Sequence, residues 1–390
     1  MPVLPRLAHR ALDIQPFRVM DILAQARALE AQGRDIVHME IGEPDFPTPA
    51  PIVEAGIAAL KAGHTHYTPA LGLPALREAI AAHYATRYGV TLSPRRVVIT
   101  PGSSGALLLA IGALLNPGDE LLLADPGYPC NRHFARFVEG RAIGVPVGPA
   151  TRYQLAPAHI EQYWSEQTRA ALVASPANPT GSLLSLDALR ALHAAVAARQ
   201  GTLIVDEIYH GLTYGQEAAT ALTVSDDVFV INSFSKYFGM TGWRLGWMVA
   251  PEAYVDALDR LAQNLFLAAS TPAQHAALAA FAPDTLAILE MRRAEFQQRR
   301  DFLLPALRSL GFELPLAPEG AFYLYADCGQ LSDNGETLAR RALQEAGVAI
   351  TPGLDFGAFE ARRHVRFAYT TARERLQLGV ERLAAMLRSA

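Results

Sequence analysis

Cysteine, lysine and long apolar runs are all scarce in this sequence of 390 residues, and each scarcity excludes a class of protein. Cys130 and Cys328 are the only cysteines, too few for a disulfide framework or a four-thiolate zinc site. The longest apolar run, Ala106–Leu115, is about half the length of a membrane span. The formal net charge of −4 offers no electrostatic attraction for nucleic acid or an anionic membrane, so we expect neither as a partner.

Composition and the N-terminus point to a globular protein. Hydrophobic residues make up 51% of the chain and charged residues 18%, which excludes a disordered chain. Charged side chains, among them Arg6, Arg10 and Asp13, occupy the stretch where a signal peptide needs an apolar core. We therefore expect a soluble, cytoplasmic protein of about two to three domains.

Lysine is nearly absent from the basic residues. Of the 34 lysines and arginines, only Lys61 and Lys236 are lysines. Arginine can replace lysine wherever charge alone is needed, but it cannot form a stable imine or lose its proton at ordinary pH. Lys61 ends a predicted helix, where a cation favours the helix dipole. Lys236 lies in a different setting, described below.

Strand and helix patterns alternate over much of the chain. The predicted strands are short, continuous apolar runs, typical of strands buried on both faces of a largely parallel sheet. Polar residues follow these strands, at the edge where α/β sheets bind ligands. We predict a first helix over Val19–Gln32 and strands over Ile36–Ile41, Val97–Thr100, Glu120–Ala124, Ala170–Ala174, Thr202–Val205 and Val228–Ile231.

The pattern changes near residue 286. A long Arg- and Glu-rich helix is followed by two strands, Phe322–Tyr325 and His364–Phe367, and by a terminal helix. Mixed strands and helices of this kind indicate a smaller α+β domain. We predict an N-terminal segment over 1–45 that joins the small domain, a large domain over 46–285, and the small domain over 286–390.

Lys236 follows a predicted buried strand, next to two hydroxyls. Ser233 and Ser235 precede it, and Arg244 comes eight residues later. Hydroxyls, an arginine and a lysine at one strand end would make an anion site beside a nucleophilic amine. The alternative is a surface lysine with serines that cap a helix, which the scarcity of lysine elsewhere disfavours.

Other polar residues occupy similar positions. Asp206 ends a strand and needs a partner if buried, although it could simply cap a following helix. Pro101–Gly105 precedes a predicted helix. This segment is either a phosphate-binding loop or an ordinary tight turn. Asn178 lies in a turn. Arg366 lies in an apolar strand and needs an anion, from a ligand or a salt bridge. The histidines show no spacing typical of a metal site, so we assign no metal.

The ordered set of motifs resembles the pyridoxal-phosphate-dependent aminotransferases of class I/II, of fold type I (the aspartate aminotransferase superfamily). The resemblance runs from about Ile36 to the C-terminus. It implies an α/β fold with a large cofactor-binding domain, whose mostly parallel central sheet is flanked by helices, and a smaller α+β domain. The motifs are Ile41–Phe46, His66–Pro69, Asp125–Pro129, Asn178–Gly181, Asp206–Tyr209, Ser233–Lys236, Met240–Gly246 and Val365–Phe367.

This resemblance implies roles for the cofactor-binding residues. Lys236 matches the lysine that binds pyridoxal 5'-phosphate covalently and then moves a proton. Asp206 matches the partner of the pyridine nitrogen, Tyr209 and Asn178 the pair on the phenolic oxygen, and Tyr128 the ring stacked on the cofactor. The implied phosphate ligands are Ser103, Ser104, Ser233, Ser235 and Arg244, joined by Tyr67 from a neighbouring subunit.

The substrate side follows from the same resemblance. Arg366 matches the arginine that binds the substrate carboxylate, with help from the backbone of Gly42 and from Asn178. We therefore expect a homodimer with shared active sites, in which an L-amino acid and a 2-oxo acid exchange an amino group with ping-pong kinetics.

The prediction of the substrate class depends on the absence of a cation from one segment. The segment Gln263–Ala269, where dicarboxylate-specific relatives carry an arginine, has no cation, so we expect neutral or aromatic amino donors. Alternatives that keep the fold are a C–S β-lyase and a kynurenine-type transaminase. A regulatory protein with an aminotransferase-like domain would need a DNA-binding segment, for which we find no room before Ile36.

Overall fold

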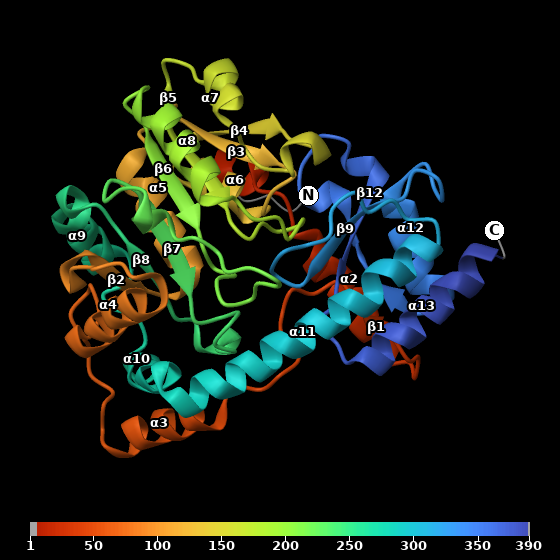
Figure 1. Ribbon diagram of the computed structural model, residues 1–390, viewed down its shortest axis with the longest axis horizontal. Coiled ribbons are helices and arrows are strands. Elements are labelled where there is room, and N and C mark those ends of the chain that lie inside the picture. The colour runs from red at the N-terminus through yellow and green to blue at the C-terminus, as the bar shows by residue number, and fades with distance from the viewer. Residues whose placement is uncertain (1–5, 389–390) are drawn as a thin grey trace.

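A computed structural model describes residues 6–388, and its centre is a seven-stranded sheet. All neighbouring strands in it are parallel except those that flank β8, which runs antiparallel to both of its neighbours. Figure 1 shows this sheet as the core of the larger part of the molecule. In spatial order its strands are β2 (Val97–Thr100), β8 (Gly246–Val249), β7 (Phe229–Ser233), β6 (Thr202–Asp206), β5 (Thr168–Ala174), β3 (Glu120–Asp125) and β4 (Arg141–Pro146).

Helices cover both faces of this sheet, which is why its strands are apolar throughout. Successive residues of each strand alternate between two hydrophobic clusters: Leu122 faces one and Leu123 the other. The cluster that contains Leu123 includes α5 (Gly102–Leu114), α6 (Cys130–Phe137) and α9 (Val255–Leu265). The cluster that contains Leu122 includes α3 (Ala50–Lys61), α4 (Pro74–Tyr88), α7 (Pro157–Tyr163), α8 (Leu186–Ala197) and α10 (Thr271–Leu278).

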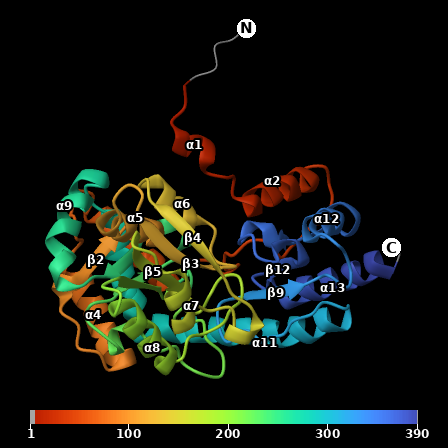
Figure 2. The same ribbon diagram turned by 90° about the horizontal axis from the view of Figure 1, so that it is seen from above.

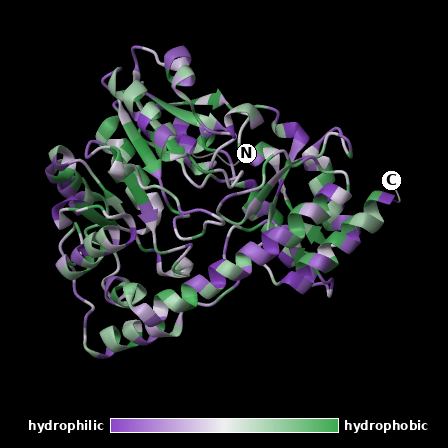
Figure 3. Ribbon diagram, viewed as in Figure 1, coloured by the Kyte–Doolittle hydropathy of each residue, from purple (hydrophilic) through white to green (hydrophobic). Residues whose placement is uncertain are grey.

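The sequence predicted five of the seven strands and missed β4 and β8. The β4 strand lies at the sheet edge, and Gly144 and Pro146 interrupt its apolar pattern. The β8 strand directly follows the turn that carries Arg244, which masked its start. Figure 3 shows the sheet as predominantly hydrophobic and α11 (Pro283–Ser309) as mixed.

A second body contains the C-terminal part of the chain. Its antiparallel sheet runs in the order β11 (Thr351–Pro352), β12 (His364–Ala368) and β9 (Tyr323–Asp327). The helix α11 leads from the first body into this one (Figure 1). The remaining helices of this body are α12 (Gly335–Arg341) and α13 (Arg373–Arg388).

Within the N-terminal segment, the helix α2 (Arg18–Glu30) lies beside α12 of this second body (Figure 2), whereas α1 (His9–Asp13) forms ion pairs with Arg136 and Glu139 of the first body. The helix α2 matches the predicted first helix, whereas the short α1 was not predicted. The predicted strand Ile36–Ile41 is reduced to β1 (Val37–His38), which pairs in parallel with β10 (Val348–Ala349). The domain boundaries after residues 45 and 285 stay predictions, and residues 1–5 and 389–390 of the outer domains lie outside the described chain. Within 6–388, no helix combines the length and the apolarity that crossing a bilayer requires.

Candidate active site

The carboxyl ends of the parallel strands open onto one cavity of about 320 Å³. Residues that follow β3, β5, β6 and β7 line it, as expected for a ligand site in an α/β sheet. The N-terminal segment and two strands of the second body, β9 and β12, complete the wall. The cavity therefore lies where the two bodies meet.

Lys236 projects into this cavity from the turn after β7. Its Nζ donates a hydrogen bond to the carbonyl oxygen of Gly42 at 2.7 Å. Loss of water lowers the pKa of Lys236 to about 8, against the nearby charge of Glu43, which raises it. The charges of Arg366 and Arg244 contribute to this lowered pKa, and the charge of Asp206 opposes it. An amine with such a pKa is partly neutral near pH 8 and can act as a nucleophile.

Asp206 ends β6 at the base of the cavity and is only 4% exposed. A turn follows it, so the alternative of a helix cap does not apply, and its Oδ1 accepts from the backbone N–H of Ile208 at 3.1 Å. Burial raises the pKa of Asp206 to about 7, although that hydrogen bond and Lys236 oppose the change. No lysine, arginine or histidine of the described chain forms an ion pair with this carboxylate.

One part of the cavity wall is rich in hydroxyl groups. Ser103 and Ser104 lie in the first turn of α5, which starts at Gly102 with a positive φ of 70°. A Cβ at Gly102 would come within 2.6 Å of the Arg244 guanidinium, so only glycine lets the arginine approach the helix start. Hydroxyls, helix N–H groups and a guanidinium together can hold a dianionic phosphate.

Ser235 lines this part of the cavity, and Ser233 lies behind it. The Ser233 hydroxyl donates to Ser235 Oγ at 2.9 Å and accepts from the Ser235 backbone N–H at 3.0 Å. Ser233 thus reaches the cavity through Ser235.

Three aromatic hydroxyl groups surround the middle of the cavity. Tyr128, Tyr209 and Tyr323 all line it, and burial is the first cause that raises the pKa of each phenol. The hydroxyls of Tyr209 and Tyr323 are 2.9 Å apart. Phe17 of the N-terminal segment packs edge-on against Tyr128, with ring centroids 6.3 Å apart. These side chains can grip a flat ring.

Arg366 lies on β12 in the wall of the cavity and is 3% exposed. Its Nη1 donates to Asn178 Oδ1 at 3.0 Å, and its Nη2 donates to the carbonyl oxygen of Glu40 and to Thr351 Oγ1. No carboxylate within residues 6–388 forms an ion pair with it, and its buried Nε lacks a hydrogen-bond partner in the same range. A buried cation with only neutral partners can bind an anionic ligand.

The structure brings together most of the residues that the sequence singled out. Tyr67 is the exception: it does not line the cavity, and its side chain is 83% exposed. The sequence missed Tyr323, Glu40 and Thr351. Tyr323 was within a predicted strand, and period-two alternation would have placed it on the same face as Tyr325.

The cavity offers no ligand set typical of a metal. In the part of the chain that the structure describes, no group of three or more His, Cys, Asp or Glu side chains could hold a metal ion. What the cavity does combine is an amine of lowered pKa, a buried carboxylate, a hydroxyl-rich helix start and a guanidinium that forms no ion pair within the described residues.

Comparison with known proteins assigns the family. Residues 34–383 match the model of the family "Aminotransferase class I and II". The chain is 36% identical over 384 residues to (5-formylfuran-3-yl)methyl phosphate transaminase of Methanocaldococcus jannaschii, covering 98% of this chain and 99% of that protein. It is 37% identical to valine–pyruvate aminotransferase of Mycobacterium tuberculosis (98% and 99%) and 34% to aspartate/prephenate aminotransferase of Thermus thermophilus (98% and 98%).

Solved structures agree over the whole chain. An aminotransferase from Mycobacterium tuberculosis superimposes with a TM-score of 0.96 at 37% identity, covering 99% of this chain and 100% of that one. A protein from Methanococcus jannaschii, described as similar in its active site to kynurenine aminotransferases, gives 0.90 at 36% identity, with 98% and 100% covered. This chain therefore belongs to the class I and II aminotransferases and is a transaminase of fold type I.

Proposed function

We propose that this transaminase binds pyridoxal 5'-phosphate at Lys236 and moves the amino group of a neutral or aromatic L-amino acid to a 2-oxo acid. The observation that carries the proposal is that one cavity holds three charged groups that form no ion pair with one another or with any other residue of the described chain. Lys236 has a carbonyl partner, Asp206 a backbone N–H, and Arg366 only neutral acceptors. Each is costly to bury unless a ligand completes it.

The side chains fit the chemical groups of this cofactor. Ser103, Ser104, Ser235 and Arg244 would hold its phosphate, with Ser233 orienting Ser235. Asp206 would pair with the ring nitrogen and keep it protonated, which also relieves the cost of the buried carboxylate. Tyr209 and Asn178 would donate to the phenolic oxygen, and Tyr128 would cover the ring. The cofactor supplies an electron sink for the carbanion that forms at the substrate Cα.

The protein's own residues would then bind the substrate and move its proton. Arg366, with Asn178 and the backbone of Gly42, would fix the substrate carboxylate and so orient the Cα–H bond. Lys236, whose pKa is lowered to about 8, would take the proton at Cα as a neutral amine and release it again as a cation.

The walls of the cavity support a neutral or aromatic donor. Phe17, Val19, Met20 and Ile41 line its N-terminal side. Among the described residues that line it, the cations are Lys236, Arg244 and Arg366, each already assigned. A second substrate carboxylate would therefore be buried without a partner. The name of the Mycobacterium tuberculosis relative, which refers to valine, agrees with this choice, whereas that of the Thermus thermophilus relative refers to aspartate.

We also propose a homodimer in which Tyr67 reaches the partner's phosphate site. Two large apolar side chains are exposed within Gln263–Ala269, the segment that lacks a cation: Leu265 is 53% and Leu267 58% exposed. Exposed apolar residues of this kind are typical of subunit contacts. The measurement is sedimentation of the holoenzyme, with Leu267→Asp expected to shift the dimer toward monomer.

The test of the function is the visible absorption spectrum of the protein with pyridoxal phosphate. We expect a visible band that shifts when phenylalanine, valine or alanine is added and that is absent in Lys236→Ala. A higher kcat/KM for aspartate than for these donors would overturn the donor class. Pyruvate and ammonia released without a 2-oxo acid would favour the C–S lyase alternative, and a protein without a visible band would refute cofactor binding.

A further inference from the structure

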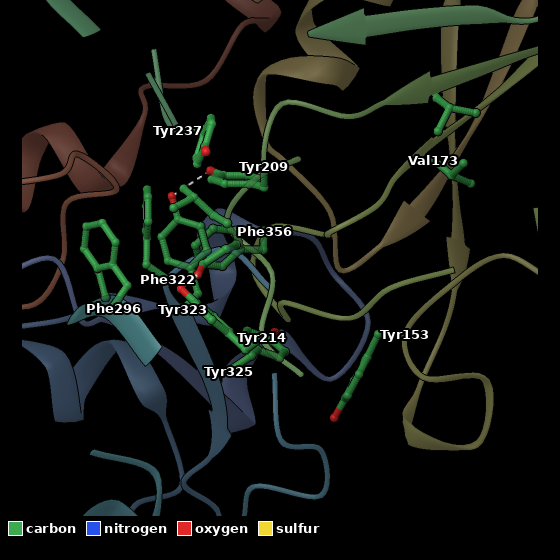
Figure 4. Close-up of a cluster of buried hydrophobic side chains, with 14 of the residues drawn as sticks. Tyr153, Val173, Tyr209, Tyr214, Tyr237, Phe296, Phe322, Tyr323, Tyr325 and Phe356 are labelled. Carbon is green, nitrogen blue, oxygen red and sulfur yellow. Dashed lines mark hydrogen bonds between the residues drawn. The ribbon is translucent and has the colours of Figure 1, made fainter. Parts of the chain in front are cut away.

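Tyr323 lies at the centre of the cavity and contacts three of the residues to which we assign roles. It is the first residue of β9, and its side chain is 1% exposed. Its hydroxyl is 2.9 Å from that of Tyr209, and Figure 4 marks this hydrogen bond with a dashed line. A Cβ at Gly42 would collide with the same hydroxyl. The backbone of Gly42, whose carbonyl oxygen accepts the Lys236 hydrogen bond, therefore packs directly on Tyr323.

The ring of Tyr323 contacts the substrate end of the site. The Arg366 guanidinium carbon lies 4.2 Å from the centroid of this ring and 4.8 Å from that of Phe356. A guanidinium at such distances is attracted by the faces of aromatic rings. With its Nε unpaired, Arg366 depends on these rings as well as on its hydrogen bonds for its orientation.

Donor counting fixes the direction of the tyrosine–tyrosine hydrogen bond when the cofactor is bound. A phenol has one proton to donate and can accept two hydrogen bonds. If Tyr209 donates its proton to the phenolic oxygen of the cofactor, it can only accept from Tyr323. Tyr323 must then be the donor, and hydrogen bonds arranged in series strengthen one another.

We propose that Tyr323 is a positioning residue that donates to Tyr209, aims the Tyr209 hydroxyl at the cofactor's phenolic oxygen, and supports Arg366 with its ring. This inference rests on the proposed function and deepens it. Its two parts can be separated, because phenylalanine keeps the ring and removes only the hydroxyl.

A spectral titration tests the hydroxyl. A stronger donor on the phenolic oxygen withdraws negative charge and would make a proton on Nζ of the cofactor-bearing Lys236 less stable. In holoenzyme carrying Tyr323→Phe, the acid–base midpoint of the visible band should therefore rise by about 0.5–1 pH unit. The charged groups that face this nitrogen are the same in both proteins: Glu43, Arg366, Arg244 and Asp206.

Steady-state kinetics tests the ring. Tyr323→Phe should lower kcat by about 3–10-fold and change the KM for the amino donor less than about twofold. Tyr323→Leu should in addition raise this KM by about 5–30-fold, because Arg366 loses a ring that it faces. An unchanged KM in Tyr323→Leu would overturn the second part of the proposal.

Tyr325 provides a matched control on the same strand. It is buried, it stacks on His364, and its hydroxyl has no hydrogen-bond partner within the described residues. Tyr325→Phe makes the same chemical change two residues away (Figure 4) and should leave the midpoint and kcat as in the wild type. A midpoint that is unmoved in Tyr323→Phe, or moved equally in both variants, would overturn the inference alone. A wild type without a visible band would overturn the proposed function as well.

Discussion

Buried arginines outside the cavity differ from the one inside it in how they are paired. Arg299 belongs to helix α11 and is buried. It forms ion pairs with Asp45 of the N-terminal segment and with Glu295 of its own helix, each at 2.9 Å. Arg96 pairs with Asp226 and donates to the carbonyl oxygen of Ala250 at 2.8 Å. Arg366 is equally buried but has only neutral partners. Away from the cavity, carboxylates pair with these two guanidinium groups, whereas Arg366 forms no ion pair within residues 6–388, which makes it a marker of the site. Burial raises the pKa of Asp355, and the charge of Arg366 opposes this change without an ion pair.

Two adjacent carboxyl groups differ in how many hydrogen bonds they accept. Glu207 is fully buried and accepts from the Thr220 hydroxyl and, at 2.7 Å, from the backbone N–H of Ala221. Asp206, its neighbour, faces the cavity and has one hydrogen bond, from Ile208. Burial raises the pKa of Asp206 to about 7 and that of Glu207 to about 8. Only the first of the two is open to a ligand.

The largest expected effect separates the two lysines. Lys236→Ala should abolish the visible band and lower kcat by at least about 10⁴-fold, because no other amine reaches the cofactor. Lys61→Ala, at the end of α3, should leave the band and the rate as in the wild type. Absorption spectra and single-turnover rates of both variants measure this. An active Lys236→Ala with a normal band would break the comparison.

The next effect separates Asp206 from Glu207. Asp206→Asn should lower kcat/KM by about 10²–10³-fold, since the ring nitrogen loses its anionic partner. Glu207→Gln, the same change one residue later, should cost less than about threefold, because a glutamine can keep both acceptor bonds. Steady-state kinetics at pH 8 decides, and similar losses in the two variants would contradict the assignment.

Asp206→Asn, which should lower activity, should raise the stability of the cofactor-free protein. The pKa of Asp206 rises from 3.8 to about 7 on folding, so its charge destabilises the folded state increasingly above pH 4 and fully above pH 7. Asp206→Asn should therefore stabilise the cofactor-free protein at pH 8 by roughly 1–4 kcal/mol and have little effect at pH 4. Urea unfolding at both pH values measures the difference; destabilisation at pH 8 would contradict this account.

Replacing the arginines by lysine should sharpen the comparison further. Arg366→Lys should raise the KM for the amino acid by about 10–100-fold and leave the spectrum of the bound cofactor unchanged, because the two-pronged grip on the carboxylate is lost. Arg299→Lys should leave the KM unchanged and lower the free energy of unfolding by about 1–2 kcal/mol. A loss of unfolding free energy in Arg366→Lys without a change in KM would mean that Arg366 has a structural role.

The smallest effect concerns a paired charge beside the site. His38 Nδ1 donates to Oε1 of buried Glu40 at 2.7 Å, and this contact is the first cause that raises the pKa of His38 from 6.5 to about 9. Its contribution to stability is therefore full below pH 6.5 and lost as the pH rises through about 9. His38→Gln should remove this decline, worth about 1–2 °C in the unfolding temperature, without moving the cofactor spectrum.

Sequence reasoning reached much of the fold because its strands are continuous apolar runs, such as Ala170–Ala174, which follow from burial on two faces. It failed where other forces decide the structure. The edge strand β4 has little need of apolar residues, and β1 is short because only Val37 and His38 pair with β10.

Sequence reasoning singled out Asp206 and Lys236 because they are unusual residues at strand ends, and the structure places both in the wall of one cavity. The neutral partners of Arg366 could not be predicted, because Glu40 contributes a backbone carbonyl, which no side chain reveals. Tyr323 was missed for a related reason: within Phe322–Tyr325 the aromatic residues look alike, and only the fold shows which hydroxyl meets Tyr209.

One measurement tests the central claim most directly: the rise in unfolding temperature that pyridoxal phosphate causes at pH 8 in three proteins. A ligand stabilises the folded state according to its affinity for it. If Asp206 is the buried charge that the cofactor completes, the wild type and Glu207→Gln should show a similar, large rise, and Asp206→Asn less than about half of it. An equal rise in all three proteins would contradict the account.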